Sequence, residues 1–377
     1  MKTNILALSF GLMVLGVLAA QNPTDKTTPP KSGESIDFNK ARSIFQKQSG
    51  GGKLTQEEIH YLERAKAARK EGQGQPKNSR MINGKDKIGL KPLNEMTGQD
   101  NYLGQDGGLY GNGKNFPPEA HRKSAQAAIS RLKPLNNAGN LDEKGTIGFV
   151  SISMSNATQE FSMFKQLADA DPSKSKLVKI IDCAQGGQAM AEWVDPKGRP
   201  WLEAEKRLSA AAVNPNQVQV AWIKLANKGP NGDLKEHGEK LEKDTLAVIQ
   251  NAKAKFPNLQ LAYLSSRIYG GYSTGALNPE PYAYESAFPV RWLIQRQIKE
   301  DKSLSFEGTK VLSPVLLWGP YLWADGVTPR QSDKLVYNRD DLAADGTHPS
   351  QAGRQKVANV MLEFFKNDPL AKSWFMK

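Results

Sequence analysis

From about residue 145 onward, five short apolar runs alternate with longer stretches of helical periodicity, and few folds accommodate this pattern. The runs are residues 147–152, 177–181, 218–223, 259–264 and 311–317. Strands that are apolar without interruption are typical of parallel sheets, whose two faces are both covered by helices. The sequence therefore predicts an α/β fold of three layers around a central parallel five-stranded sheet.

The stretches between these runs carry apolar residues at helical spacing. They are residues 157–168, 202–212, 235–254, 284–298 and 350–365. In an open parallel sheet, ligands bind beyond the carboxyl ends of the strands. We therefore expect the functional side chains in the loops that follow the strands.

The first twenty residues have the composition of a signal peptide. Lys2 is followed by an apolar run over 5–18 and by the small residues Ala19 and Ala20. This run is shorter than the ~20 apolar residues that a spanning helix needs, and no other segment approaches that length. The sequence predicts a secreted or periplasmic protein without a membrane span. Gln21 offers no thiol for a lipid anchor.

The region between the signal peptide and the first strand divides into three parts. Residues 21–36 are rich in Pro, Thr, Ser and Lys and predict a flexible linker. Residues 37–70 predict a helical hairpin, whose second helix opens with the capping box Thr55 and Glu58. Residues 71–140 are rich in glycine and predict irregular structure that wraps the main domain, with one helix from Pro118 to Arg131. The main domain is expected over 141–377.

Charge and cysteine content narrow the possible partners. The formal net charge is +12, but lysines alternate with acidic residues and no nucleic-acid-binding motif is present. We expect no nucleic-acid partner, and instead an attraction to polyanionic polysaccharide outside the cell. Cys183 is the single cysteine, so no intramolecular disulfide can form. A buried packing role is expected for it, because no base lies beside it in the sequence.

Asp345 and His348 lie three residues apart, directly before the last predicted helix. At that spacing a carboxylate can hold one ring nitrogen while the other faces a hydroxyl. The chain has four histidines. His60 and His237 are expected in solvated helices and His121 outside the sheet region, which leaves His348 as the candidate general base.

Ser155 follows the first predicted strand at a strand-to-helix junction. A hydroxyl there is exposed and lies near the positive end of a helix dipole. An ordinary N-cap serine is the alternative interpretation, because serine favours such positions.

Together these segments resemble the SGNH or GDSL-like hydrolases over about residues 145–367. The resemblance implies a flavodoxin-like sandwich and a triad of Ser155, His348 and Asp345. The family's final Asp-x-x-His block is matched by Asp345 and His348, whereas its Gly-Asp-Ser block reads Ser153-Met154-Ser155 here.

The same resemblance implies an oxyanion hole. Its donors would be the backbone N–H of Ser155, the backbone N–H of Gly187 and the side-chain amide of Asn227. For Gly187 a plain glycine turn is the alternative.

Aromatic residues after the fifth run suggest a substrate class. Trp318, Tyr321 and Trp323 are expected near the rim of the site, and Arg267 and Tyr269 follow the fourth run. Flat aromatic faces suit sugar rings, as in similar carbohydrate esterases, although core packing is the alternative for each ring.

The sequence thus predicts a secreted serine ester hydrolase that removes acetyl or another small acyl group from a carbohydrate. It would act through an acyl-enzyme, without metal or organic cofactor. The alternatives are a general carboxylesterase or lipase-like enzyme of the same type, and a catalytically inactive carbohydrate-binding protein with this fold.

Overall fold

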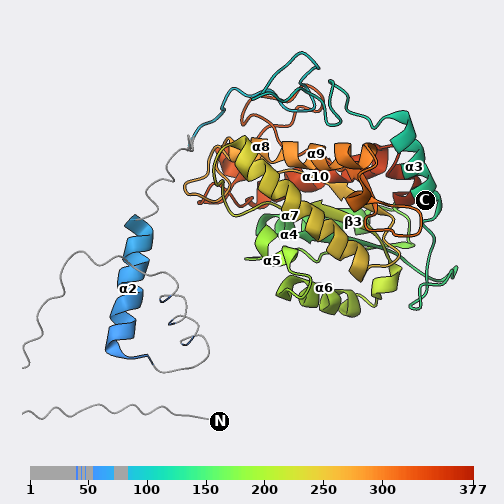
Figure 1. Cartoon of the computed structure of the whole chain (residues 1–377), viewed down its shortest axis with the longest axis horizontal. Coiled ribbons are helices and arrows are strands. Elements are labelled where there is room, and N and C mark those ends of the chain that lie inside the picture. The colour runs from blue at the N-terminus through green and yellow to red at the C-terminus, as the bar shows by residue number, and fades with distance from the viewer. Residues whose placement is uncertain (1–39, 41–43, 45–46, 48–53, 72–83) are drawn as a thin grey trace, which may run out of the picture. The chain divides into compact units, whose positions relative to one another are not determined.

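A computed structural model describes residues 40, 44, 47, 54–71 and 84–377 (Figure 1). The chain divides into two compact units, Met1–Gly72 and Gln73–Lys377. The predicted signal peptide and linker lie outside the described residues, as does most of the first helix of the predicted hairpin.

The first unit contains helix α2, Gln56–Glu71. Its start is the predicted capping box: the Thr55 backbone N–H donates to the Glu58 carboxylate at 2.8 Å, and the Glu58 N–H donates to the Thr55 hydroxyl at 3.2 Å. Leu62 and Ala65 on this helix pack with Ile44 in a small buried apolar cluster. The helix is thus fixed at its amino end by the reciprocal cap and along its side by apolar contacts.

The second unit is built on a parallel sheet with strand order β2-β1-β3-β4-β5. The strands are β1 (Ile147–Ser153), β2 (Val178–Ile181), β3 (Val218–Lys224), β4 (Leu261–Leu264) and β5 (Val315–Trp318). This order is that of the flavodoxin-like doubly wound sheet. The predicted five-stranded parallel sheet and three-layer architecture are confirmed. Because β1 lies between β2 and β3, the loops after these three strands meet at one edge.

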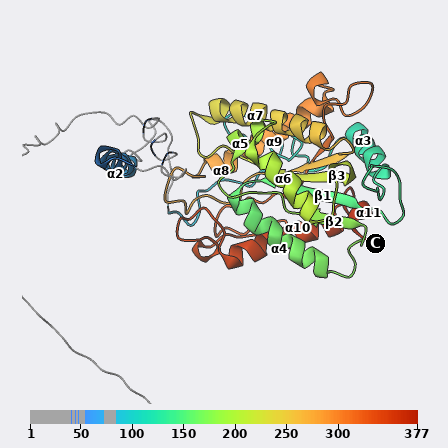
Figure 2. The same cartoon turned by 90° about the horizontal axis from the view of Figure 1, so that it is seen from below.

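Helices cover both faces of the sheet, as Figure 2 shows. The larger ones are α4 (Ser155–Ala170), α5 (Met190–Val194), α6 (Arg199–Ala210), α7 (Leu234–Lys255), α9 (Ala287–Ile298) and α10 (Gln351–Asn367). Helices α4 and α10 pack together on one face, and α5, α6, α7 and α9 lie on the other. Helix α3 (Glu119–Ser130) packs beside β5.

Short elements complete this unit. They are α8 (Tyr282–Glu285), α11 (Lys372–Phe375), and the 3-10 turns η1 (Pro215–Gln217), η2 (Lys302–Leu304) and η3 (Arg339–Asp341).

The core holds β1 and α4 rigidly together. The Phe161 ring of α4 meets Phe149 of β1 edge-to-face at 5.5 Å between centroids and stacks on Trp222 of β3 at 5.4 Å. All three side chains are fully buried. Aromatic pairs of this kind add to the stabilisation from buried area, so the junction between β1 and α4 has a firm base.

Two element boundaries differ from the prediction. The run expected over 311–317 forms a strand only from Val315, because Val311 is exposed and Pro314 has no N–H to donate to a sheet. The helix expected over 284–298 is broken at Ser286, which separates α8 from α9. The Ser286 hydroxyl accepts a bond from the Arg267 N–H and donates to Ala283 O, so it competes with the helical pattern.

Residues 84–118 contain turns and isolated bridges, and they are packed into the second unit. Leu93 and Met96 are buried in the main core, and the Leu93 N–H donates to the Tyr321 hydroxyl at 3.1 Å. The Arg291 guanidinium of α9 donates to Asp106 O at 2.6 Å. The irregular structure predicted here is therefore anchored by side chains of α9 and of the loop after β5. Among the helices in the described part of the chain, none is long and apolar enough to cross a membrane.

Candidate active site

Ser155, His348 and Asp345 form a continuous hydrogen-bonded row. Ser155 Oγ lies 2.8 Å from His348 Nε2, and His348 Nδ1 lies 2.5 Å from Asp345 Oδ2. With the imidazole proton on Nδ1, that nitrogen donates to the carboxylate and Nε2 accepts from the serine hydroxyl. This is the order of groups that activates a serine for attack on a carbonyl.

Strand β1 and helix α4 place the serine. Ser155 is the first residue of α4, and Met154, in extended conformation, precedes it as the N-cap. The Ser153 hydroxyl donates to Lys224 O of the neighbouring β3, which ties the end of β1 to the sheet. Ser155 is half-buried. Its hydroxyl bonds a histidine and caps no helix, so the ordinary N-cap interpretation is wrong.

A short loop before α10 holds the histidine and the aspartate. Asp345 Oδ1 accepts from the backbone N–H groups of Thr347 and His348, both at 3.0 Å. The Thr347 hydroxyl donates to Leu277 O at 2.9 Å, which braces the loop from the side. Helix α10 then begins with Ser350 as its N-cap, whose hydroxyl accepts from the Gly353 N–H. Asp345 is thus oriented by its own loop before it meets the imidazole.

The carboxylate of Asp345 is in its charged form at neutral pH. Partial burial raises its pKa, but the bonds from the His348 side chain and from two backbone N–H groups outweigh this, and the net pKa is lowered. Its side chain is 48% exposed and that of His348 is 27% exposed. Both are reachable from solvent.

Gly187 and Asn227 lie on the loops that flank the end of β1. The loop after β2 is tied to β1 by a bond from the Gln185 N–H to Ser153 O at 3.1 Å. It is tied to the loop after β3 by a bond from the Met190 N–H to Ala226 O at 3.2 Å. The structure therefore brings Gly187 and Asn227 to the same edge as Ser155. In the described region neither forms a hydrogen bond with Ser155.

Gly187 has a conformation that suits a backbone donor. Its φ is +75°, in the region that favours glycine, and an added Cβ would meet nothing within 4 Å. The residue is exposed. Asn227 is half-buried, and its carbonyl oxygen accepts from the Tyr282 hydroxyl at 3.0 Å.

The five residues expected to bind substrate are all buried, which corrects that prediction. Trp318, Tyr321, Trp323, Arg267 and Tyr269 are between 0% and 5% exposed. Their polar atoms bond within the protein: the Tyr321 hydroxyl accepts from Leu93 N–H, Trp323 Nε1 donates to Glu280 at 2.8 Å, and the Tyr269 hydroxyl donates to Lys85 O at 2.7 Å. Residues 84–118 and the loops after β4 and β5 cover these rings. Sugar rings therefore cannot stack on them in this conformation.

The remaining histidines are placed as follows. His60 is exposed on α2, as expected. His237 was expected in a solvated helix but is buried, and its Nε2 lies 2.6 Å from Glu285 Oε2. His121 was expected outside the sheet region but is buried on α3 against β5, with its Nε2 at 2.8 Å from Leu316 O. His348 is the one that lies beside the serine.

Cys183 is buried, as expected, and burial raises the pKa of its thiol well above its usual value. A thiol in that state is unreactive.

Beneath the serine the structure contains a buried ion pair that the sequence analysis missed. Lys224 of β3 bonds Glu160 of α4, and both side chains are 0% exposed. Arg267, 2% exposed, lies close enough to interact electrostatically with both. The sequence feature that could have revealed this ion pair is the lysine that ends the run VQVAWIK. This run forms β3, and all of its residues are buried.

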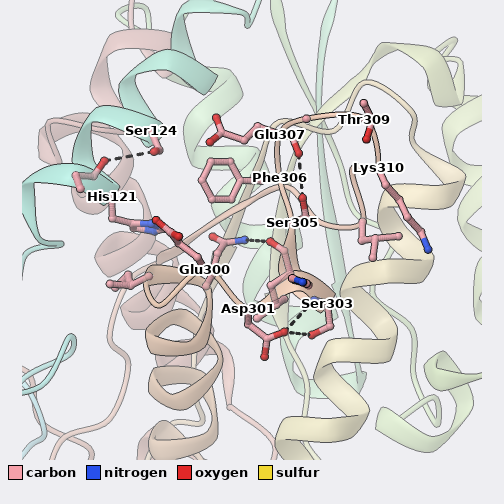
Figure 3. A pocket seen from close by; sticks show the side chains of 17 residues that line it. His121, Ser124, Glu300, Asp301, Ser303, Ser305, Phe306, Glu307, Thr309 and Lys310 are labelled. Carbon is pink, nitrogen blue, oxygen red and sulfur yellow. Dashed lines mark hydrogen bonds between the residues drawn. The ribbon is translucent and has the colours of Figure 1, made fainter.

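A cavity of about 890 Å³ lies elsewhere (Figure 3). It is lined by His121 and Ser124 of α3 and by the loop 300–312, which leads into the amino end of β5. The triad lies at the carboxyl ends of the strands, so this cavity is separate from it. Within the described ranges, no group of three or more His, Cys, Asp or Glu side chains is arranged to hold a metal ion.

The sequence matches no protein-family model and no curated protein. Among solved structures, it is similar to a protein of Bacteroides fragilis provisionally described as an acylhydrolase, at 14% identity over 64% of this chain and 93% of that one, with a TM-score of 0.33.

Two further similar structures are a periplasmic domain of a lipopolysaccharide acetyltransferase from Salmonella Paratyphi A and a GDSL-like lipase from Bacteroides thetaiotaomicron. The first is 16% identical over 62% of this chain and 86% of that one, with a TM-score of 0.33. The second is 10% identical over 67% of this chain and 98% of that one, with a TM-score of 0.32. Similarities this weak do not assign a function to this chain.

Proposed function

We propose that this chain is a secreted serine ester hydrolase of the SGNH type. The observation that carries the proposal is the row of atoms from Ser155 Oγ through the His348 ring to Asp345 Oδ2, with separations of 2.8 and 2.5 Å. Hydroxyl, imidazole and carboxylate in this order perform acyl transfer on unrelated folds, so geometry is the proper basis for recognising them.

The first half of the reaction forms an acyl-enzyme. His348 Nε2 accepts the proton of the Ser155 hydroxyl as Oγ attacks the ester carbonyl, and Asp345 stabilises the imidazolium that results. The imidazolium then gives its proton to the departing alcohol. The acyl group stays on Ser155.

The second half releases the acid. A water molecule gives a proton to His348 and attacks the acyl carbonyl, and His348 then returns that proton to Ser155 Oγ as the acyl–oxygen bond breaks and the acid leaves. In both halves the backbone N–H groups of Ser155 and Gly187 and the amide of Asn227 are the proposed donors to the oxyanion. Their place at one edge supports this assignment, since the loop after β2 is hydrogen-bonded to the last residue of β1 and to the loop after β3.

The proposed substrate is a small acyl ester, acetyl above all, of a carbohydrate outside the cell. The net charge of +12 and the signal-peptide composition of residues 1–20 support a polyanionic polysaccharide as the partner. The buried rings at Trp318, Tyr321 and Trp323 lend no support to it. The experiments below distinguish this enzyme from two alternatives, which are a carboxylesterase without sugar preference and an inactive carbohydrate-binding protein.

Substitution of the serine tests the chemistry directly. In Ser155→Ala we expect the turnover of short p-nitrophenyl esters to fall by ~10³-fold or more, because the variant has no nucleophile. A fluorophosphonate should label the wild type at Ser155 and should not label the variant. Acetylated glycans assayed beside the simple esters report the alcohol that is preferred.

Ser162→Ala is the matched control, because Ser162 lies on the same helix and its hydroxyl donates to Asp182 at 2.6 Å, away from His348. It should keep its label and its turnover. Full turnover by a folded Ser155→Ala variant would falsify the proposed mechanism. Glycan binding by a wild-type protein that takes no label would favour the inactive binding protein.

A further inference from the structure

Arg267 is a buried cation without a carboxylate partner. It follows β4, is 2% exposed, and its Nη1 lies 3.2 Å from the sulfur of Met154. Its Nε is buried and has no hydrogen-bond partner, and among the residues that the structure describes no carboxylate forms an ion pair with it. A buried charge that forms no direct ion pair is costly, so its retention calls for a reason other than stability.

The charges around Arg267 come from three elements. Glu160 of α4 and Lys224 of β3 form the fully buried ion pair, and Glu280 and Tyr282 interact with the guanidinium from the segment before and within α8. Burial lowers the pKa of Arg267 to about 10, while Tyr282, Glu160 and Glu280 act to raise it, so it is a cation at neutral pH. Lys224 offsets Glu160, and the carboxyl of Glu280 is mostly protonated below about pH 7, so in that range Arg267 contributes an additional positive charge.

This charge lies against the residue that precedes the serine. Met154, which the guanidinium contacts, is the N-cap residue of α4 and immediately precedes Ser155. Ser153, one residue earlier, bonds to the backbone of Lys224. Residues 153–155, which end at the nucleophile, are thus held by β3, which carries Lys224, and by the segment after β4, which carries Arg267.

We infer that Arg267 is a positioning residue of the proposed reaction, which fixes Met154 and holds a positive charge behind Ser155 where negative charge develops on the reacting oxygens. The inference rests on the proposed function. A fixed charge in a water-excluded site stabilises a transition state more than it does in water, because nothing reorganises as the reaction proceeds. The guanidinium contacts the Met154 side chain and forms no hydrogen bond with the serine in the described residues, so the effect acts through that contact and through the electrostatic field.

Removing this charge should change the pH dependence of kcat/KM. A nearby cation disfavours the protonated form of a general base and a nearby anion favours it, so the acid limb of kcat/KM should move to higher pH when a cation is removed and to lower pH when an anion is removed. One charge acting over about 10 Å at an effective dielectric constant near 20 changes a pKa by about 1 unit. The groups that face the ring directly are the carboxylate of Asp345 and the neutral hydroxyl of Ser155, and both are unchanged in the variants below.

The test uses the full chain, p-nitrophenyl acetate and the pH dependence of kcat/KM. In Arg267→Met, which keeps an unbranched apolar stem, we expect kcat to fall by about 10-fold or more with KM changed less than about 2-fold. The acid limb of kcat/KM should move to higher pH by about half a unit or more. Arg267→Lys should restore most of the turnover and return the limb to its wild-type position. Glu160→Gln removes a charge of the opposite sign and should move the limb to lower pH.

Arg291→Met is the matched control, since Arg291 is also 2% exposed but interacts with Asp106. It should lower the melting temperature and leave both kcat and the acid limb in place. Folding of every variant is checked by circular dichroism. The inference would be overturned if folded Arg267→Met kept the wild-type kcat and the wild-type acid limb of kcat/KM. It would also be overturned if the acid limb moved in the same direction in Glu160→Gln as in Arg267→Met. If Arg267→Met does not fold, an unmoved limb in Glu160→Gln overturns it. Full turnover by Ser155→Ala would instead show that the proposed function itself is wrong.

Discussion

At the scale of single residues, the most unusual acid is Glu280. Its Oε1 accepts from the Gly270 N–H at 2.7 Å and from Trp323 Nε1 at 2.8 Å, and its Oε2 accepts from the Tyr284 N–H at 3.0 Å. Burial outweighs these bonds and raises the pKa of the carboxyl to about 7. The glutamate therefore organises the segment after β4 and titrates near neutrality.

This titration predicts how stability depends on pH. In the folded state Glu280 keeps its proton up to about pH 7, whereas in the unfolded chain it loses it near its ordinary value of 4.5. Between these values the folded state binds more protons, so this group's contribution to stability falls as pH rises, by about 3 kcal/mol at most. Above about pH 7 its contribution is constant.

Glu280→Gln removes the titration. The free energy of unfolding of the variant, measured relative to wild type by urea denaturation, should improve between about pH 5 and pH 8. Turning the new amide toward the Tyr284 N–H carries a cost, but that cost is the same at every pH. A difference that stays constant across the range would contradict the raised pKa.

At the scale of elements, the active geometry depends on one loop that is held from both sides. The Asp345–His348 loop is closed by a bond from the Ala343 N–H to His348 O at 2.7 Å. It is braced by a bond from the Thr274 N–H to Asp345 O at 3.2 Å. Gly346 lies where the two loops meet, with φ of +66°, and an added Cβ would overlap the Tyr272 carbonyl oxygen.

Gly346→Ala should therefore damage both stability and activity. We expect a loss of roughly 2–4 kcal/mol in the free energy of unfolding, from the clash and the strained φ together. At a temperature where the variant is still folded, kcat/KM should fall because the clash pushes Asp345 and His348 out of line.

Gly308→Ala is the comparison for this element, because Gly308 has φ of +85° and nothing within 4 Å of an added Cβ. It should lose about 1–2 kcal/mol from conformation alone and keep its kcat/KM. Equal activity of both variants would show that the loop tolerates displacement.

At the scale of the whole molecule, the site is contained in one compact unit. All three triad residues and the loops with Gly187 and Asn227 belong to Gln73–Lys377. Residues 84–118 are part of its packing, since Leu93 is fully buried and the Tyr102 hydroxyl donates to Glu285 at 2.7 Å. We therefore extend the proposed division of the chain: residues 141–377 carry the chemistry, and 84–140 cover their apolar loops.

A fragment of residues 73–377 should retain the wild-type kcat/KM on p-nitrophenyl esters. The first unit has its own small apolar cluster and contributes no triad residue. A fragment that begins at residue 119 should instead be insoluble or inactive, because it exposes Tyr321 and Trp318. Loss of activity in the longer fragment, despite a native circular dichroism spectrum, would assign the first unit a part in catalysis.

Much of this architecture was determined by the sequence itself. Five apolar runs separated by helical periodicity permit essentially one layer arrangement, because a strand that is apolar on both faces must be covered on both. The capping box at Thr55 and Glu58 and the row Ser155, His348 and Asp345 were likewise predicted, because each depends on short-range spacing or on the shared edge where parallel strands end.

What only the tertiary structure decided is which side chains are covered. Trp318, Tyr321 and Trp323 follow a strand end, as a binding rim would, yet residues 84–118 lie over them. The buried contact of Glu160 with Lys224 joins positions 64 apart in the chain, and no local pattern encodes such a pairing. Periodicity reports the face on which a side chain lies, whereas burial depends on segments distant in sequence that pack against that face.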